Sequence, residues 1–209
     1  MSLENVSATK INLIQTKRTL NLAESGRDIL ERKRDILLRE LRTSIFEAQK
    51  AREELVGALS VAYRSLKEAQ LAKGSETVEN VALGSSFEAD FLMDYRSVMG
   101  VTVPIIDFRR EIDAKPDYGF ANTSAELDLA FNQFYKVLDF IAELARAEGT
   151  VFQISNDVHK TQRRVNALNY VLIPRYHGTV KRIEQVLEEK EREEFVRTKR
   201  IKHMIKENV

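Results

Sequence analysis

The residues between Thr9 and Lys73 repeat an apolar pattern with a period of seven, and this repeat limits the fold more than any other feature. One row begins at Leu13 and Leu20, returns at Leu41 and ends in alanines; a companion row holds Leu30 and Leu37 and then shifts by one residue to Ile45. Such spacing over about nine heptads is typical of a helix that buries one stripe against a partner helix. The segment holds no proline. We therefore predict a single helix on the order of 100 Å long.

Two arginines, Arg27 and Arg34, interrupt the first row. Their aliphatic stems can lie along the stripe while the guanidinium groups reach water. Alternatively, they pair with acidic side chains on the facing helix. The alanines toward Ala62 and Ala69 predict that the two backbones approach closely there.

A second stripe runs along the C-terminal segment, where several apolar residues lie four apart at Leu168, Leu172, Tyr176 and Val180. Four-residue steps in succession indicate a local unwinding of a coiled coil. Pro174 lies in the same stretch and cannot donate a hydrogen bond to the carbonyl of Tyr170, so we expect a kink or a local break. We assign these residues to the seam between the two long helices: Leu20, Leu30, Leu37, Leu41, Val165, Leu168, Leu172, Ile183 and Leu187.

The middle of the chain differs in composition, since ten of its sixteen Phe and Tyr residues fall between Phe87 and Phe140. Alternating residues on both sides of Met99-Gly100 predict a β-hairpin at about 88–108, with Pro104 on an edge strand. We expect Phe91, Met93 and Tyr95 to pack on a neighbouring helix, and a loop to follow between Asp107 and Thr123. A helix is predicted at about 124–147, and the pattern leaves open whether it bends at Gly149 or continues through it.

Together these patterns predict a mainly α fold: a long antiparallel two-helix coiled coil formed by the N- and C-terminal helices, with a small head that holds the hairpin and a shorter helix. We divide the chain into the N-terminal helix (residues 1–73), the head (74–148) and the C-terminal helix (149–209). Each long helix carries an apolar stripe that it can bury only against a partner helix. Antiparallel pairing of the two helices is the simplest solution.

Composition excludes several classes of function. The formal charge is +1, which argues against a nucleic-acid partner, and the absence of cysteine excludes disulfides and thiolate chemistry. No apolar run is long enough to cross a membrane, no phosphate-binding glycine motif is present, and His159, His177 and His203 lie far apart in the sequence. We expect a soluble, intracellular chain that is not an enzyme and holds no cofactor or metal. The rival hypotheses are a stand-alone coiled-coil scaffold or membrane-surface protein, and a helical-bundle metalloenzyme.

Three separated blocks show a resemblance to a known family. They are the segment from Ala8 to Leu41, the hairpin sequence RSVMGVTVP (Arg96 to Pro104), and TQRRVNALNYVLIPR (Thr161 to Arg175) with the tail from Glu191 to Ile205. In this order they resemble the D subunit of the V-type and archaeal A-type ATPases. The resemblance implies a central rotor shaft in single copy. Rotation of such a shaft couples ATP synthesis or hydrolysis to proton or sodium-ion transport.

The resemblance also implies partners: the hexamer of A and B subunits, the small F subunit, and the funnel-shaped C (d-type) subunit on the membrane ring. The complex is expected on the cytoplasmic side of the cell membrane. Our candidates for contact with the hexamer are Arg163, Arg164, Arg175, Arg197, Lys199, Arg200 and Lys202. The alternative is that these are solvated helix charges. Candidates for docking through the hairpin are Val98, Met99, Val101 and Val103.

Overall fold

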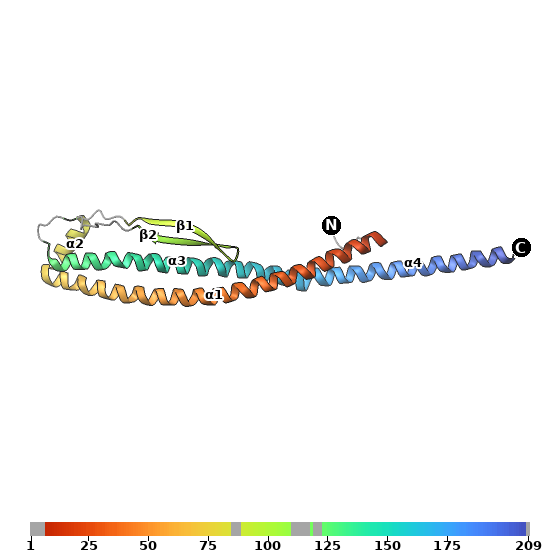
Figure 1. The fold of residues 1–209 in the computed structure, drawn as a ribbon, viewed down its shortest axis with the longest axis horizontal. Helices are drawn as coiled ribbons and strands as arrows, with labels where there is room; N and C mark the ends of the chain where they lie inside the picture. Colours follow the sequence, from red (N-terminus) through yellow and green to blue (C-terminus); the bar gives the residue numbers. More distant parts are fainter. Residues whose placement is uncertain (1–6, 85–88, 110–117, 119–122, 208–209) are drawn as a thin grey trace. The chain divides into compact units, whose positions relative to one another are not determined.

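The computed structural model describes residues 7–84, 89–109, 118 and 123–207. These form α1 (Lys10–Lys73), α2 (Ser75–Gly84), β1 (Phe91–Val98), β2 (Val101–Phe108), α3 (Ala125–Ala167), the π-helical turn η2 (Leu168–Leu172) and α4 (Ile173–Glu207) (Figure 1). The chain divides into two compact units. Unit 1 holds the described parts of residues 1–35 and 159–209, and unit 2 holds those of residues 36–158.

The predicted fold class is confirmed, because the chain is mainly helical and the N- and C-terminal helices pack against each other with a two-stranded hairpin in addition. α1 ends at Lys73, where Gly74 takes a positive φ of 85°. Glycine adopts this left-handed conformation without steric cost, so it commonly ends helices. The short helix α2 that follows is an element that the sequence pattern does not predict. Only Val78 of α2 is buried, so its apolar pattern is weak.

α3 passes through Gly149 without interruption, which settles the alternative that the sequence left open. The loop predicted between Asp107 and Thr123 lies mostly outside the described residues. Among the described residues, no helix has the length and apolar character needed to cross a membrane.

In unit 1 the start of α1 packs against α4. The core consists of Leu20, Ile173 and Val180, with Leu168 and Tyr176 packed at its edge. In unit 2 a second core joins three elements, with Leu37 from α1, Val101 and Val103 from β2, and Ile154 from α3. Each core is only a few residues wide, as expected where two helices meet along one stripe.

The seam of α1 in unit 2 keeps a strict heptad. After Leu37 and Leu41 the buried positions are Ser44, Ala51, Ala62 and Ala69, while Ile45 is 39% exposed. The predicted shift of the companion row is therefore wrong at Ile45, whereas Leu59 and Leu66, the next residues of the shifted row, are half-buried. The fully buried positions of this part of α1 after Leu37 therefore carry small side chains.

The hairpin pairs Val98 with Val101, so Met99 and Gly100 form a two-residue loop. Both have positive φ, 51° and 79°. Positive φ at both loop positions is the requirement of the tight turn that matches the twist of a hairpin.

Candidate contact surfaces

A ladder of polar contacts fixes the register of α1 against α4 in unit 1. Lys10 Nζ lies 2.9 Å from Glu191 Oε1, and Lys17 Nζ lies 2.6 Å from Glu184 Oε1. Farther along, His177 Nε2 lies 3.2 Å from Glu24 Oε1, and the Asn169 amide donates to Glu31 at 3.2 Å. Each contact is exposed or half-exposed, so water and salt screen it and it contributes little to stability. Their regular spacing makes them register markers more than a source of stability.

The steps of this ladder differ between the two sides. Along α1 the contacts are always seven residues apart, from Lys10 to Glu31, whereas on the opposing side two steps of seven are followed by one step of eight, from His177 to Asn169. The long step spans η2, where the Ile173 N–H donates to the Leu168 carbonyl five residues earlier. A π turn holds one residue more than the α-helical turn it replaces. The extra residue keeps both sides of the ladder in phase.

The buried seam shows the same insertion. It runs Val165, Leu168, Ile173, Val180 and Ile183, with Ile173 only 7% exposed and Leu172 half-buried beside it. From Leu168 the step to Ile173 is five residues where a heptad would have four. The sequence prediction assigned this position to Leu172 and expected a four-residue insertion; the structure places Ile173 there and inserts one residue. η2 ends two residues before Pro174, which has no backbone N–H to donate, so the disturbance expected near this proline is a π turn.

The nine predicted seam residues are all buried or half-buried; Leu37, Ile183 and Val165 are 0%, 0% and 1% exposed. Arg27 and Arg34 neither simply extend into water nor pair with acidic side chains on the facing helix, which were the two alternatives predicted. Each forms an ion pair with the next residue of its own helix, Asp28 or Asp35, at 2.7 and 2.8 Å. Arg34 also donates to Gln162 across the seam at 3.3 Å.

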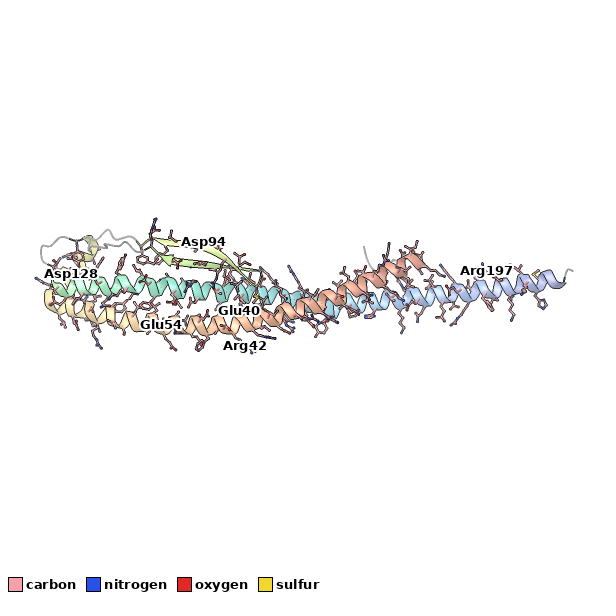
Figure 2. All side chains as sticks on the ribbon, viewed as in Figure 1. Glu40, Arg42, Glu54, Asp94, Asp128 and Arg197 are labelled. Carbon is pink, nitrogen blue, oxygen red and sulfur yellow. The ribbon has the colours of Figure 1, made fainter. Side chains whose placement is uncertain are left out.

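The seven basic residues predicted to contact a hexamer are all exposed. Four of them lie on the part of α4 after Glu191, which pairs with Lys10 at the first residue of α1. Beyond that pair, α4 has no packing partner among the residues that the structure describes, and Figure 1 shows α4 extending past the start of α1. Phe195, Ile201 and Met204 are 70%, 58% and 62% exposed there, beside Arg197, labelled in Figure 2. This end of α4, which we call the α4 tip (residues 192–204), presents mixed basic and apolar side chains.

The four hairpin residues predicted for docking do not lie together on the surface. Val101 and Val103 are 5% and 0% exposed in the core of unit 2, and Val98 packs against that core. Met99, at the turn, is 59% exposed. Val101 and Val103 are buried, so a partner cannot reach their side chains. Docking therefore remains a proposal for the turn alone, through Met99 and the half-buried Val98.

The prediction that Phe91, Met93 and Tyr95 pack on a helix is wrong: they are 39%, 60% and 62% exposed. Strand β2 lies against the helices and leaves β1 on the outer side of the ribbon, so every residue of β1 before Val98 is exposed. Alternation alone does not indicate which strand of a hairpin lies inward.

A close approach seats the hairpin on α3. A Cβ built at Gly149 would lie 2.7 Å from Pro104 Cγ. Only the absence of a side chain at residue 149 lets β2 lie this close to the helix. The sequence pattern marks Gly149 only as a potential helix break and does not reveal this role.

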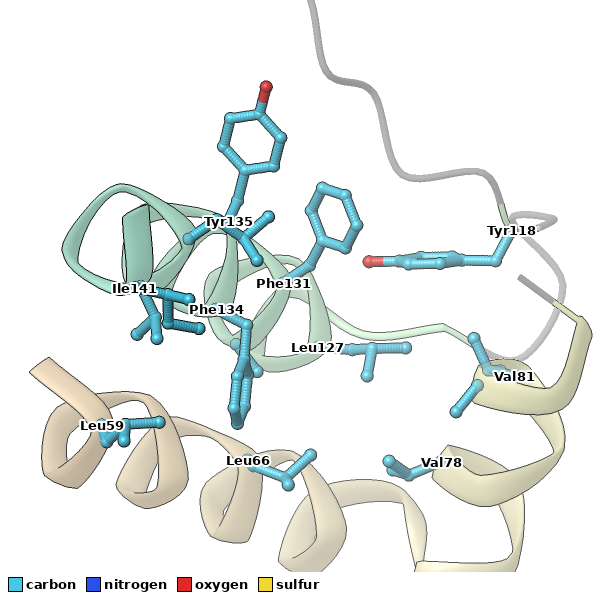
Figure 3. Close-up of a pocket in the computed structure, with 14 residues that line it drawn as sticks. Leu59, Leu66, Val78, Val81, Tyr118, Leu127, Phe131, Phe134, Tyr135 and Ile141 are labelled. Atoms are coloured by element: carbon cyan, nitrogen blue, oxygen red, sulfur yellow. The ribbon is translucent and has the colours of Figure 1, made fainter. Parts of the chain in front are cut away.

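An apolar cavity of about 550 Å³ lies in unit 2 among α1, α2 and α3 (Figure 3). Leu59, Leu66, Val78 and Phe134 line it, and Tyr63 meets Phe134 edge to face at 5.4 Å between ring centroids. At its border the Tyr118 hydroxyl donates to Asp128 at 2.6 Å. Burial and this bond to a carboxylate raise the pKa of Tyr118 well above the ordinary tyrosine value.

Comparison with known proteins identifies the family. The sequence profile of the ATP synthase D subunit matches residues 12–203. The chain belongs to this family. It is 42% identical to the D subunit of the V-type ATP synthase of Thermotoga neapolitana, covering 96% of this chain and 98% of that protein. It is 38% identical to the D subunit of the A-type ATP synthase of Pyrococcus furiosus (96% and 94%) and 39% identical to that of Methanopyrus kandleri (97% and 88%).

Proposed function

We propose that this member of the family of ATP synthase D subunits is the central rotor shaft of a V/A-type ATPase. In this proposal it couples ATP synthesis or hydrolysis in the A/B hexamer to translocation of protons or sodium ions through the membrane ring. It carries no catalytic residue of its own and is present in single copy on the cytoplasmic side of the cell membrane.

The observation that carries the proposal is the register-locked pair of α1 and α4. A shaft has to transmit torque, so its two helices must neither slide nor rotate about one another. A buried seam through Leu20, Ile173 and Val180, flanked by polar contacts at seven-residue steps, opposes both movements. The π turn maintains this register where the two sequences differ in length by one residue.

The contact with the hexamer falls, in this proposal, to the α4 tip with Arg197, Lys199, Arg200 and Lys202, and to Arg163, Arg164 and Arg175. All seven are solvent-exposed. Exposed charges that remain hydrated give a contact that forms and breaks easily, as a rotating bearing requires. The small F subunit and the funnel-shaped C (d-type) subunit are the other expected partners, and we propose the Met99 turn as one docking contact.

The first test is co-purification of the full chain with the A and B subunits, followed by ATPase assays with and without it. A chain lacking residues 194–209 is compared with a control variant, Arg64→Glu with Lys67→Glu, which reverses the charge of two exposed cations in unit 2. We expect one copy of the full chain per hexamer, weaker assembly for the truncation and no change for the control. Failure of the full chain to join the hexamer, with self-association or vesicle binding instead, would favour the scaffold alternative.

A second test asks whether α1 and α4 turn as one body. The chain has no cysteine, so cysteines introduced at Glu24 and His177, whose side chains meet at 3.2 Å, form a unique pair. Joining them with a short bifunctional reagent should leave coupled ATPase activity unchanged. Loss of coupling on cross-linking, restored by cleavage of the link, would show that the helices must move against each other and would refute the shaft mechanism.

A further inference from the structure

A polar groove of about 450 Å³ lies in unit 2 between α1, α3 and the turn end of β1. Its lining comes from residues 40–54 of α1, 96–98 of β1 and 143–150 of α3, and we call it the hairpin groove. It shares no lining residue with the apolar cavity of Figure 3. Pockets of about 300–1,000 Å³ are typical of small-molecule sites, and the rotor role proposed above makes no use of this one.

Seven charged side chains line the hairpin groove, and four of them are paired within their own helix. Lys50 Nζ lies 3.7 Å from Glu54 Oε1, and Arg146 Nη2 lies 3.8 Å from Glu143 Oε1. The other three form no ion pair or hydrogen bond within the described part of the chain: Glu40, Glu47 and Arg96. The charges left for a ligand are therefore two carboxylates and one guanidinium group.

Ser44 lies between the two free acids on the same side of α1. Glu40, Ser44 and Glu47 are four and three residues apart, which places them in one row on the helix surface. Ser44 lines the groove and is only 3% exposed, yet its hydroxyl forms no hydrogen bond with any residue that the structure describes. Buried polar groups nearly always have a hydrogen-bond partner. A polar ligand in the groove would supply one.

We propose that the hairpin groove binds a free basic amino acid, of which lysine is the simplest. The two cations of such a molecule complement the carboxylates of Glu40 and Glu47. Its carboxylate complements Arg96, because a guanidinium group binds a carboxylate with two parallel hydrogen bonds. The Ser44 hydroxyl accepts a hydrogen bond from an ammonium group of the ligand. This site is separate from every contact in the proposed function.

The spacing of the two acids suits the length of lysine. Glu40 and Glu47 are seven residues apart, a rise of ~10.5 Å along a helix. The two nitrogens of extended lysine are joined by six bonds of about 1.5 Å and lie roughly 7.5 Å apart. With a charge-assisted hydrogen bond of about 2.8 Å at either end, lysine reaches both carboxylates. Diaminopropionate, whose nitrogens are joined by only three bonds and lie roughly 4 Å apart, falls short.

The first experiment titrates the full chain with lysine at low ionic strength and follows the amide NMR signals. We expect saturable shifts at Ser44, Val98 and Thr150, which line the groove on its three sides. The dissociation constant should be about 1 mM, and added salt should weaken binding because the contacts are ionic. Absence of saturable shifts at ten times this concentration would overturn the proposal, as would shifts that fall outside the groove.

Four analogues test each part of the ligand on the wild-type chain. Nε-acetyl-lysine and Nα-acetyl-lysine each lack one cation, lysinamide lacks the carboxylate, and diaminopropionate is too short. Each should bind roughly fivefold more weakly than lysine, the value of one exposed ion pair. Equal binding of any analogue would overturn the proposed pairing. Equal binding of Nα-acetyl-lysine would also point to the C-terminal residue of a protein as the ligand, instead of a free amino acid.

Variants test the groove side of the same pairs. Glu40→Gln, Glu47→Gln and Arg96→Gln should each weaken lysine binding roughly fivefold. The matched controls are Glu53→Gln and Arg64→Gln, which change exposed side chains of unit 2 outside the groove and should alter binding less than about twofold. Circular dichroism confirms the helical content of each variant. Equal binding by all five would overturn the proposal.

A cycle of ligand and protein changes assigns the carboxylate. Lysinamide and lysine should bind Arg96→Gln equally well, because both the variant and the analogue remove the same pair. A fivefold preference for lysine that persists in Arg96→Gln would overturn the role of this arginine. All of these measurements use the chain alone, so their outcome is independent of whether it joins the hexamer.

Discussion

Replacing Gly149 by alanine tests whether the hairpin is seated on α3 as the structure shows. The added Cβ would lie 2.7 Å from Pro104 Cγ, against about 3.5–4.0 Å for an ordinary contact between carbons. The hairpin must therefore move by about 1 Å. Overpacking of this kind typically costs about 1–3 kcal/mol.

Two other effects decide the net result. Alanine favours the helix over glycine by about 1 kcal/mol, which opposes the strain. Complete release of the hairpin would expose Val101 and Val103 and cost roughly 1.5–3 kcal/mol for each. Release therefore costs more than the strain, and we expect the hairpin to shift while it remains in place.

Gly57→Ala is the matched control, because Gly57 lies inside α1 of the same unit with nothing within 4 Å of its position for a Cβ. The propensity gain is common to both variants, so their difference isolates the strain. We expect Gly149→Ala to be about 2 kcal/mol less stable than Gly57→Ala in urea unfolding followed by circular dichroism. Hydrogen exchange of residues 91–108 should be faster in Gly149→Ala alone.

Adding Pro104→Ala removes the ring carbon that the new Cβ meets, so most of the difference should disappear in the double variant. Equal stability of Gly149→Ala and Gly57→Ala would refute the reasoning. So would a double variant in which the two substitutions act independently, because the strain would then lie elsewhere.

Three further outcomes follow from the structure. Met99→Asn should stabilise the chain by about 0.5–1 kcal/mol in urea unfolding, since Asn adopts positive φ more readily than Met; no gain would contradict the turn geometry. The pKa of Tyr118 is raised in the folded chain, so the stability that its hydroxyl contributes is complete below pH 10.0 and is lost as the pH rises above that value. Above pH 10.0 the urea midpoint of the wild type should therefore fall more than that of Tyr118→Phe. Equal falls in the two proteins would refute this role of Tyr118. Deleting Val171 together with Pro174→Ala should convert η2 into regular α-helix and keep the polar ladder in phase, so the melting temperature should change little. Deleting Lys181 instead should turn the following helix by ~100° and lower the melting temperature sharply. Equal melting temperatures for the two deletion variants would contradict the role of η2.

The sequence was sufficient to predict the elements with long or sharp patterns. The heptads from Leu13 onward predict α1 and its end at Gly74, and alternation around Met99-Gly100 predicts the hairpin. α2 was missed because ten residues with one buried side chain carry little periodicity. The exposure of Arg163, Arg164 and Arg175 agrees with a contact role, and only an experiment with partners tests that role.

The remaining differences have a common physical cause, which is that a pattern along one chain does not specify what faces it. Leu172 and Ile173 are adjacent and both apolar, so the sequence does not indicate which of them lies on the seam. The extra residue of η2 places Ile173 there. Val101 and Val103 alternate in the same way as Phe91 and Met93, yet β2 alone lies against the helices. Nothing in the sequence around Gly149 indicates that Pro104, 45 residues earlier, occupies the space above it.

The core of unit 1 joins residues from distant parts of the sequence, and this has a consequence for the newly made chain. Leu20 is buried by Ile173 and Val180, which the ribosome adds about 150 residues later; at ~5–20 residues per second this takes roughly 8–30 s. During that interval the apolar side chains of early α1 have no native partner, whereas Leu37 and Val101 of unit 2 can already meet. Unit 2 therefore has the opportunity to fold first, and the early part of α1 is the segment that a nascent-chain chaperone would need to shield.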